Sequence, residues 1–220
     1  MVLQTNHGGI PIVLERTQAP CTVLNFEYLT RKKYFDGTSC HRLTAYTTPP
    51  AGLSVLQCGD LLRTGWGEPG YAFRDELASA NQLENWPGFP DGSRKVYPRG
   101  SLAMANGGPD TNGSQFFLVY EDSRLRLDYT VSGHVSEEGI KVLDTIAAGD
   151  IARAAVEPRE CCPVGFELIG PLQPRPQHRP RGFHPRVEAW LGLMQDVPAA
   201  PCSARPWRSS PSWGVGPGQR

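Results

Sequence analysis

The 220-residue sequence has no long hydrophobic run and no excess of either charge. Its uncharged apolar stretches fall far short of the roughly 18–20 residues that a membrane-spanning helix needs, so we expect no membrane segment. Lysine and arginine together number 22, as do aspartate and glutamate, and this balance argues against a nucleic-acid partner. The first residues lack a basic stretch followed by an apolar one, so we expect no secretory signal and a cytoplasmic location.

The six cysteines are scattered without a dense framework, so we expect them to be reduced. Cys40 and Cys58 are expected on neighbouring strands. Buried thiols are favoured there, although a regulated disulfide or a metal site with His41 is conceivable. Two cysteines and one histidine lack the paired spacing of a zinc site, so we expect no metal and no cofactor.

The composition changes towards the C-terminus. The last fifty residues hold ten prolines and no lysine, and proline breaks helices and central strands. We therefore expect one domain over residues 1–170 and a disordered Pro- and Arg-rich extension over residues 171–220. Residues 190–194 could form a short amphipathic turn within it. The extension carries more basic than acidic residues, so it is either a cationic interaction tail or a segment without a role.

The first 150 residues alternate short apolar stretches with turn signals, which is typical of an all-β domain. Their β-branched and aromatic content favours a closed antiparallel barrel of about eight strands over a parallel α/β sheet. Two helices fit, over residues 20–33 and 137–148, and could plug the ends of the barrel. The second would be capped by Ser136 and ended by Gly149. The expected strands are 2–6, 10–14, 39–43, 54–59, 100–105, 116–120 and 130–135.

The most informative stretch is residues 104–117, which read MANGGPDTNGSQFF. A strand ends in a loop of residues that tolerate unusual backbone angles, and a second strand then begins. Gln115 and Phe117 share one face of that strand because side chains alternate, whereas Phe116 points into the core. An amide beside an aromatic floor predicts a small apolar pocket with one hydrogen-bonding wall.

This stretch closely resembles the signature of the cyclophilins, the cyclosporin-binding peptidyl-prolyl cis/trans isomerases. The resemblance covers roughly residues 2–149 and is closer to bacterial single-domain members than to eukaryotic ones. It implies a barrel capped by two helices and a monomeric isomerase that acts on Xaa-Pro bonds in peptides and unfolded proteins. Further motifs follow in the family's order: FDGT at 35–38, His41-Arg42, LQCGD at 56–60, GWG at 65–67, FRDE at 73–76 and YTVSG at 129–133.

Isomerisation of an Xaa-Pro bond faces a barrier of about 20 kcal/mol, because amide resonance is lost as the bond rotates. No covalent intermediate is required. The enzyme need only bind the twisted amide better than either planar isomer. A fixed cationic donor aimed at the prolyl nitrogen stabilises the twisted state, since this nitrogen gains a lone pair. Arginine suits the role because it is always charged and rigidly forked.

By this resemblance, the catalytic residues are Arg42, Gln57 and Gln115. Arg42 is the donor, Gln57 orients it, and Gln115 contacts the substrate residue at or before the proline. The proline ring would sit on Phe117. The other implied substrate-binding residues are Val55, Leu125 and Tyr129 as walls, the backbone of Asn106, and Gly65 and Ala105 in the neighbouring pocket.

Several positions depart from the family pattern. Ser54 stands where the family usually has phenylalanine, so one wall of the proline pocket is expected to be missing. The segment between Arg42 and Gln57 is longer than usual, and Leu53 could refill the pocket or leave it open. Arg124 replaces the tryptophan of cyclosporin-sensitive members, so weak cyclosporin binding is expected. These departures keep two alternatives open: a proline-peptide binding module without turnover, and a barrel that carries the basic tail to an acidic partner.

Overall fold

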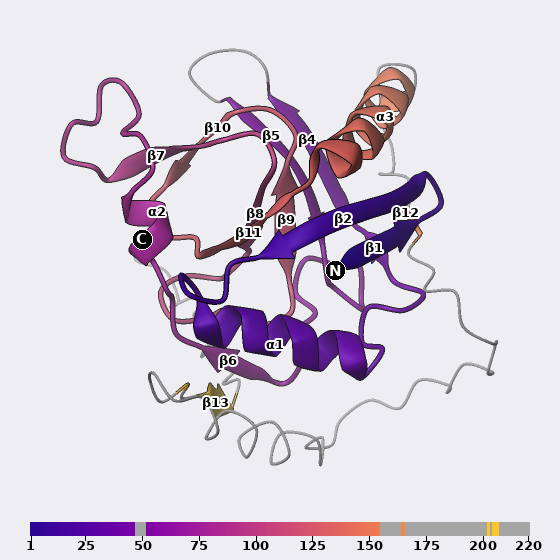
Figure 1. Ribbon diagram of the computed structural model, residues 1–220, viewed down its shortest axis with the longest axis horizontal. Helices are drawn as coiled ribbons and strands as arrows, with labels where there is room; N and C mark the ends of the chain where they lie inside the picture. Colours follow the sequence, from indigo (N-terminus) through magenta and orange to yellow (C-terminus); the bar gives the residue numbers. More distant parts are fainter. Residues whose placement is uncertain (47–51, 155–163, 166–201, 203, 207–220) are drawn as a thin grey trace, which may run out of the picture.

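The computed structural model describes residues 1–46, 52–154, 164–165, 202 and 204–206 (Figure 1). Its centre is a curled antiparallel sheet, so the fold is mainly β, as predicted. In sheet order the strands are β1 (Val2–Thr5), β2 (Gly8–Leu14), β11 (Val131–Val135), β8 (Ser101–Met104), β9 (Phe116–Val119), β5 (Leu53–Cys58) and β4 (Arg42–Tyr46).

Short two-stranded ladders accompany this sheet. They pair β7 (Arg94–Tyr97) with β10 (Ser123–Arg126), β3 (Ser39–Cys40) with β12 (Val164–Gly165), and β6 (Tyr71–Phe73) with β13 (Ala204–Pro206). Among the described residues β1 and β4 stand at the two ends of the main sheet, and β7–β10 is a separate pair. The closed eight-stranded barrel therefore stays a prediction.

Each predicted strand overlaps an observed one, with one division. The predicted strand 39–43 overlaps two observed strands, β3 and β4. The first pairs with β12 and the second with β5. Strands β6, β7 and β10 were not predicted. The sequence of β10, SRLR, has one apolar residue in four positions, so it carries no alternation that would mark a strand.

Two long helices lie where they were predicted. Helix α1 (Pro20–Arg31) lies beneath the sheet in Figure 1, and α3 (Glu137–Ala154) lies at the upper right. The Ser136 hydroxyl accepts a hydrogen bond from the Gly139 amide at 3.3 Å, so the predicted cap is confirmed. The predicted end at Gly149 is wrong, because α3 continues through it; glycine inside a helix costs only about 1 kcal/mol. A short helix, α2 (Ala78–Asn81), was not predicted.

Helix α1 begins without a capping side chain of its own, since its N-cap residue is Ala19. Glu76 supplies the cap from a distant part of the chain. Its carboxylate accepts hydrogen bonds from the amides of Cys21 and Thr22, at 3.0 and 2.8 Å, and from the Thr22 hydroxyl at 2.8 Å. The last residue of the FRDE motif therefore holds the start of α1 through three hydrogen bonds.

The two faces of the sheet carry separate apolar clusters. Phe116 packs on one face against Phe26 and Phe35 of the helical side, with ring centroids 4.9 and 5.7 Å away. Phe117 belongs to a second cluster on the opposite face, together with Val55. The predicted division between the two phenylalanines is confirmed, and the second cluster positions the site described below.

The cysteines differ from the prediction. The structure pairs Cys40 with Cys58 and Cys21 with Cys202 in disulfides, so the expectation of reduced thiols is wrong for these four residues. Cys40 and Cys58 lie on contacting strands with Cα atoms 4.0 Å apart. The other pair joins α1 to a residue 181 positions later, a proximity that spacing along the chain cannot reveal. Two further cysteines, at 161 and 162, lie outside the described residues.

Most of the predicted disordered extension, including residues 190–194, lies outside the described residues. For residues 204–206 the prediction of disorder is wrong, because they form β13 and pair antiparallel with β6. This pairing and the Cys21–Cys202 disulfide fix that point of the chain to the α1 side of the fold. Among the described residues, no helix is long and apolar enough to cross a membrane.

Candidate active site

Three polar side chains from neighbouring segments form a hydrogen-bonded chain. Arg42 faces Gln57 across the β4–β5 ladder, and its Nη1 donates to Gln57 Oε1 at 3.2 Å. Gln57 Nε2 in turn donates to Gln115 Oε1 at 2.9 Å. Gln115 Nε2 donates to the carbonyl oxygens of Gly65 and Gly67, at 2.9 and 3.1 Å. The structure thus brings the three predicted catalytic residues and Gly65 together.

This chain fixes the direction of each amide. Gln115 is buried and both its donor hydrogens are engaged, so its oxygen must face Gln57. Gln57 then has to present its own oxygen to Arg42, which lies exposed at the surface. Among the ion pairs of the described residues, none involves Arg42. An arginine has five N–H donors, so most remain available to a ligand.

An apolar surface lies beside this chain. Phe117 stands next to Gln57 in the β5–β9 ladder, and the Tyr129 ring meets it edge-on with centroids 5.5 Å apart. The Tyr97 hydroxyl donates to the backbone carbonyl of Tyr129 at 3.1 Å, which restrains the backbone that carries this ring. The remaining predicted apolar residues, Val55, Ala105 and Leu125, pack in the same cluster. Sequence analysis did not identify Tyr97.

Ser54 and Leu53 lie on opposite faces of β5. Ser54 is buried, its hydroxyl donates to Glu121 at 3.2 Å, and its amide donates to the Ser123 hydroxyl at 2.9 Å. Alternation along the strand places it opposite Val55, away from Phe117. Leu53 instead packs against the Phe117 cluster. Of the two outcomes that the sequence left open, the structure has Leu53 filling the pocket side.

The loop after β8 is held by its own Asn106 side chain and by Asp75 from a distant segment. Asn106 Nδ2 donates to the carbonyl of Asp128 at 2.7 Å, directly before Tyr129. Asp75, of the FRDE motif, accepts from the Asp110 amide at 2.9 Å and from Asn112 Nδ2 at 2.7 Å. The side chain of Asn106 is thus engaged within the protein, which leaves its backbone groups for the predicted contact with substrate.

Two ionisable side chains close in sequence to the predicted site residues have shifted pKa values: His41 precedes Arg42, and Glu68 follows Gly67. Burial raises the pKa of Glu68 to about 7, although the Ser114 amide beside it lowers the pKa. A Cβ added at Gly113 would collide with the Glu68 carboxylate, so any larger residue there would have to displace that side chain. Burial also lowers the pKa of His41, while the charges of Asp60 and Arg42 act in opposite directions. Neither residue was predicted from the sequence to matter at the site.

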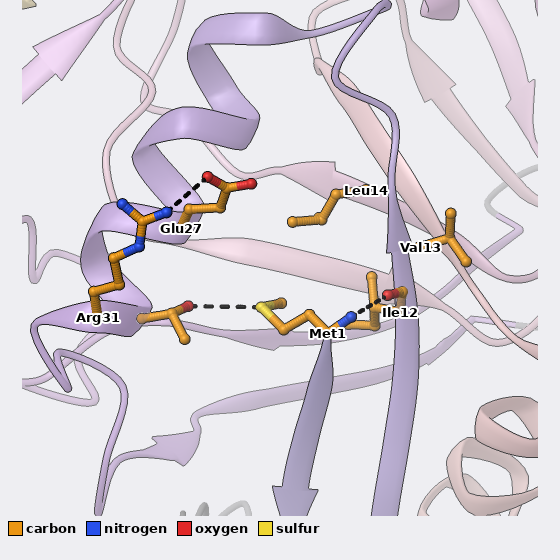
Figure 2. Close-up of a pocket in the computed structure, with 7 residues that line it drawn as sticks. Met1, Ile12, Val13, Leu14, Glu27 and Arg31 are labelled. Carbon is orange, nitrogen blue, oxygen red and sulfur yellow. Dashed lines mark hydrogen bonds and ion pairs between the residues drawn. The ribbon is translucent and has the colours of Figure 1, made fainter. Parts of the chain in front are cut away.

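The described residues contain a cavity away from the predicted site residues. A cavity of about 490 Å³ lies between α1 and β2, lined by Met1, Ile12, Val13, Leu14, Glu27, Thr30 and Arg31 (Figure 2). None of the predicted site residues lines this cavity. A Glu27–Arg31 ion pair of 3.5 Å forms part of its wall. No group of three or more metal-ligating side chains occurs in the described part of the chain.

Comparison with known proteins shows the family of this chain. The family model "Cyclophilin type peptidyl-prolyl cis-trans isomerase/CLD" matches residues 1–162. A probable peptidyl-prolyl cis-trans isomerase B of Mycobacterium leprae is 47% identical over 150 residues, covering 68% of this chain and 49% of that protein. A peptidyl-prolyl cis-trans isomerase of Helicobacter pylori is 36% identical over 156 residues, covering 70% and 83%.

A solved structure resembles the model as well. It is a Cryptosporidium parvum cyclophilin-type isomerase crystallised in the presence of the dipeptide Ala-Pro, with 29% identity, a TM-score of 0.50, and coverage of 66% of this chain and 83% of that one. The chain spans about half the length of the mycobacterial relatives that it matches. Since the family model covers well over half of the sequence, this chain belongs to the family of cyclophilin-type peptidyl-prolyl cis-trans isomerases.

Proposed function

We propose that this protein accelerates cis/trans isomerisation of Xaa-Pro bonds in peptides and unfolded proteins. The observation that carries the proposal is the hydrogen-bonded chain of Arg42, Gln57 and Gln115 beside the apolar cluster of Phe117. It sets an oriented cation next to a surface that suits a proline ring. The relatives that bear this activity in their names support the same assignment.

Substrate binding would use the Phe117 cluster. The proline ring lies on Phe117, with Tyr129 edge-on and Val55 and Leu125 at the sides. The ring leaves water on binding, which contributes roughly 25 cal/mol for each Å² of apolar surface removed. The related Cryptosporidium parvum structure, obtained in the presence of Ala-Pro, supports a proline peptide as ligand.

Catalysis would depend on the Arg42 guanidinium. As the amide twists, its nitrogen loses resonance and becomes a hydrogen-bond acceptor, so a donor aimed at it binds the twisted state better than either planar isomer. Gln57 holds one side of the guanidinium, and Gln115 fixes Gln57 in turn. This pre-organisation requires no covalent step, no proton transfer and no cofactor.

Isomer exchange of an Ala-Pro peptide, measured by NMR with the full chain, tests the proposal. We expect exchange far faster than in buffer. Peptide shifts that report binding, together with exchange no faster than in buffer, would refute the enzyme and establish the binding module. Gln115→Leu removes the link to Gly65 and Gly67, and we expect it to slow exchange while binding persists.

Three finer properties complete the proposal. We expect a monomer, with the sheet and the β7–β10 pair enclosing one barrel. We also expect weak cyclosporin binding, because position 124 holds an arginine whose guanidinium lies over the Trp86 ring at 5.5 Å. Sedimentation equilibrium tests whether the protein is a monomer. Titration with cyclosporin, followed by the exchange rate, tests whether cyclosporin binds weakly.

A further inference from the structure

The turn after β5 exposes apolar side chains beside the candidate active site. Leu61, Leu62 and Trp66 have exposed fractions of 49%, 58% and 82%, the largest among the big hydrophobic residues that the structure describes. Three large apolar side chains exposed within six residues of one turn are a candidate interaction site. We name these three side chains the apolar turn.

Polar contacts hold the backbone that carries the apolar turn. The three exposed side chains are therefore not needed to shape this segment. The buried Asp60 carboxylate accepts hydrogen bonds from the amides of Leu62, Thr64 and Gly65, at 2.6, 2.8 and 2.6 Å. Burial alone would raise the pKa of Asp60, but these backbone donors outweigh it and keep the pKa below its usual value. Gly67 packs so closely that an added Cβ would collide with Asp60.

An exposed aromatic side chain on a restrained backbone is suited to binding. Tryptophan is among the residues that most often dominate interface energies, and a pre-formed surface loses little conformational entropy on association. The backbone of Trp66 is restrained as well, because its amide donates to the Thr64 hydroxyl at 3.2 Å. The apolar turn therefore has the properties of a docking surface.

The apolar turn is continuous with the catalytic residues. Gln115 donates to the carbonyls of Gly65 and Gly67, the two residues that flank Trp66. A polypeptide whose proline lies on Phe117 therefore has Trp66 within reach of its neighbouring residues. Folded proteins bury most of their large apolar side chains, whereas an unfolded chain presents them next to its prolines.

We propose that the apolar turn binds apolar residues that flank the Xaa-Pro bond of an unfolded polypeptide. This inference rests on the proposed isomerase function and names its substrate class: unfolded chains with large apolar side chains near the proline. The apolar turn would raise the affinity for such chains. Substitutions in it should therefore change KM more than kcat.

The test compares two peptides that share one central Ala-Pro bond, one with Leu and Phe as flanking residues and the other with Ser and Gly. The readout is the ratio of their kcat/KM values, measured by NMR exchange. We expect a ratio of about ten or more for the unsubstituted protein, arising from KM. Trp66→Ser combined with Leu62→Ser should bring the ratio close to one.

Val13→Ser is the matched control, because Val13 is also an exposed apolar residue, at 46%, but lies on β2 beside the separate cavity. It should keep the ratio of the unsubstituted protein. An equal kcat/KM for both peptides, or a ratio that survives the double substitution, would overturn the proposal. So would a dimer that the double substitution dissociates, because a second copy would then be the occupant. Absence of any acceleration on either peptide would instead refute the isomerase function.

Discussion

The dependence of α1 on Glu76 gives a stability prediction that the structure makes quantitative. Glu76→Ala removes three hydrogen bonds at the start of the helix and leaves the fully buried Thr22 hydroxyl without this acceptor. Loss of an N-terminal cap costs about 1 kcal/mol, and a buried polar group that loses its partner adds about 1–3 kcal/mol. We therefore expect Glu76→Ala to lower the free energy of unfolding by about 2–4 kcal/mol.

Urea denaturation with linear extrapolation measures this loss. Glu76→Gln keeps one side-chain oxygen as acceptor but loses the negative charge that favours a helix N-terminus, so its cost should be smaller, about 1–2 kcal/mol. Glu84→Ala is the control, because Glu84 is exposed. If Glu76→Ala and Glu84→Ala destabilise the protein equally, the capping argument is wrong.

Three further predictions concern the Cys21–Cys202 disulfide and the Glu68 carboxylate. Replacing both Cys21 and Cys202 with serine should lower the free energy of unfolding by about 2–5 kcal/mol, and an unchanged urea midpoint would contradict the pairing. Burial gives Glu68 a folded-state pKa of about 7, above the ordinary value of 4.5 for a glutamate, so folding takes up a proton between these values and stability falls as the pH rises through this range. Glu68→Gln should remove that part of the pH dependence in urea titrations from pH 5 to 8; identical profiles would refute it. Gly113→Ala should destabilise the protein and slow exchange, because the new methyl group displaces Glu68 from the amide of Ser114, the residue before Gln115, and crystallography would show the displaced carboxylate.

Local pattern explains which parts of the fold could be predicted. Alternation assigned Phe116 and Phe117 to opposite faces, and the Ser136 cap marked the start of α3, because each depends on residues close in sequence. The end of α3 was misplaced because a single glycine inside a helix costs only about 1 kcal/mol and is therefore a weak stop signal. Strands as short as β10 have no such local signal.

Contacts between distant segments explain what the sequence could not supply. Glu76 and Thr22 are 54 residues apart, and Cys21 and Cys202 are 181 apart, so neither pairing follows from spacing. The candidate site came from the order of motifs that resemble a known family. The motifs did not show that Gln115 is anchored on Gly65 and Gly67, nor that Leu53 rather than Ser54 packs with Phe117.

The most direct test of the central claim is the rate of Ala-Pro exchange in Arg42→Ala and Arg42→Lys variants. Removing a pre-organised donor to a developing lone pair costs about 10²–10³ in rate, so Arg42→Ala should lose nearly all acceleration while peptide binding remains. Arg42→Lys keeps the charge but loses the fork held by Gln57, and it should recover only a small part of the rate. Arg16→Ala, which removes an exposed arginine paired with Glu27, is the control and should exchange like the unsubstituted protein. An Arg42→Ala variant that exchanges within about threefold of the unsubstituted protein would contradict the account.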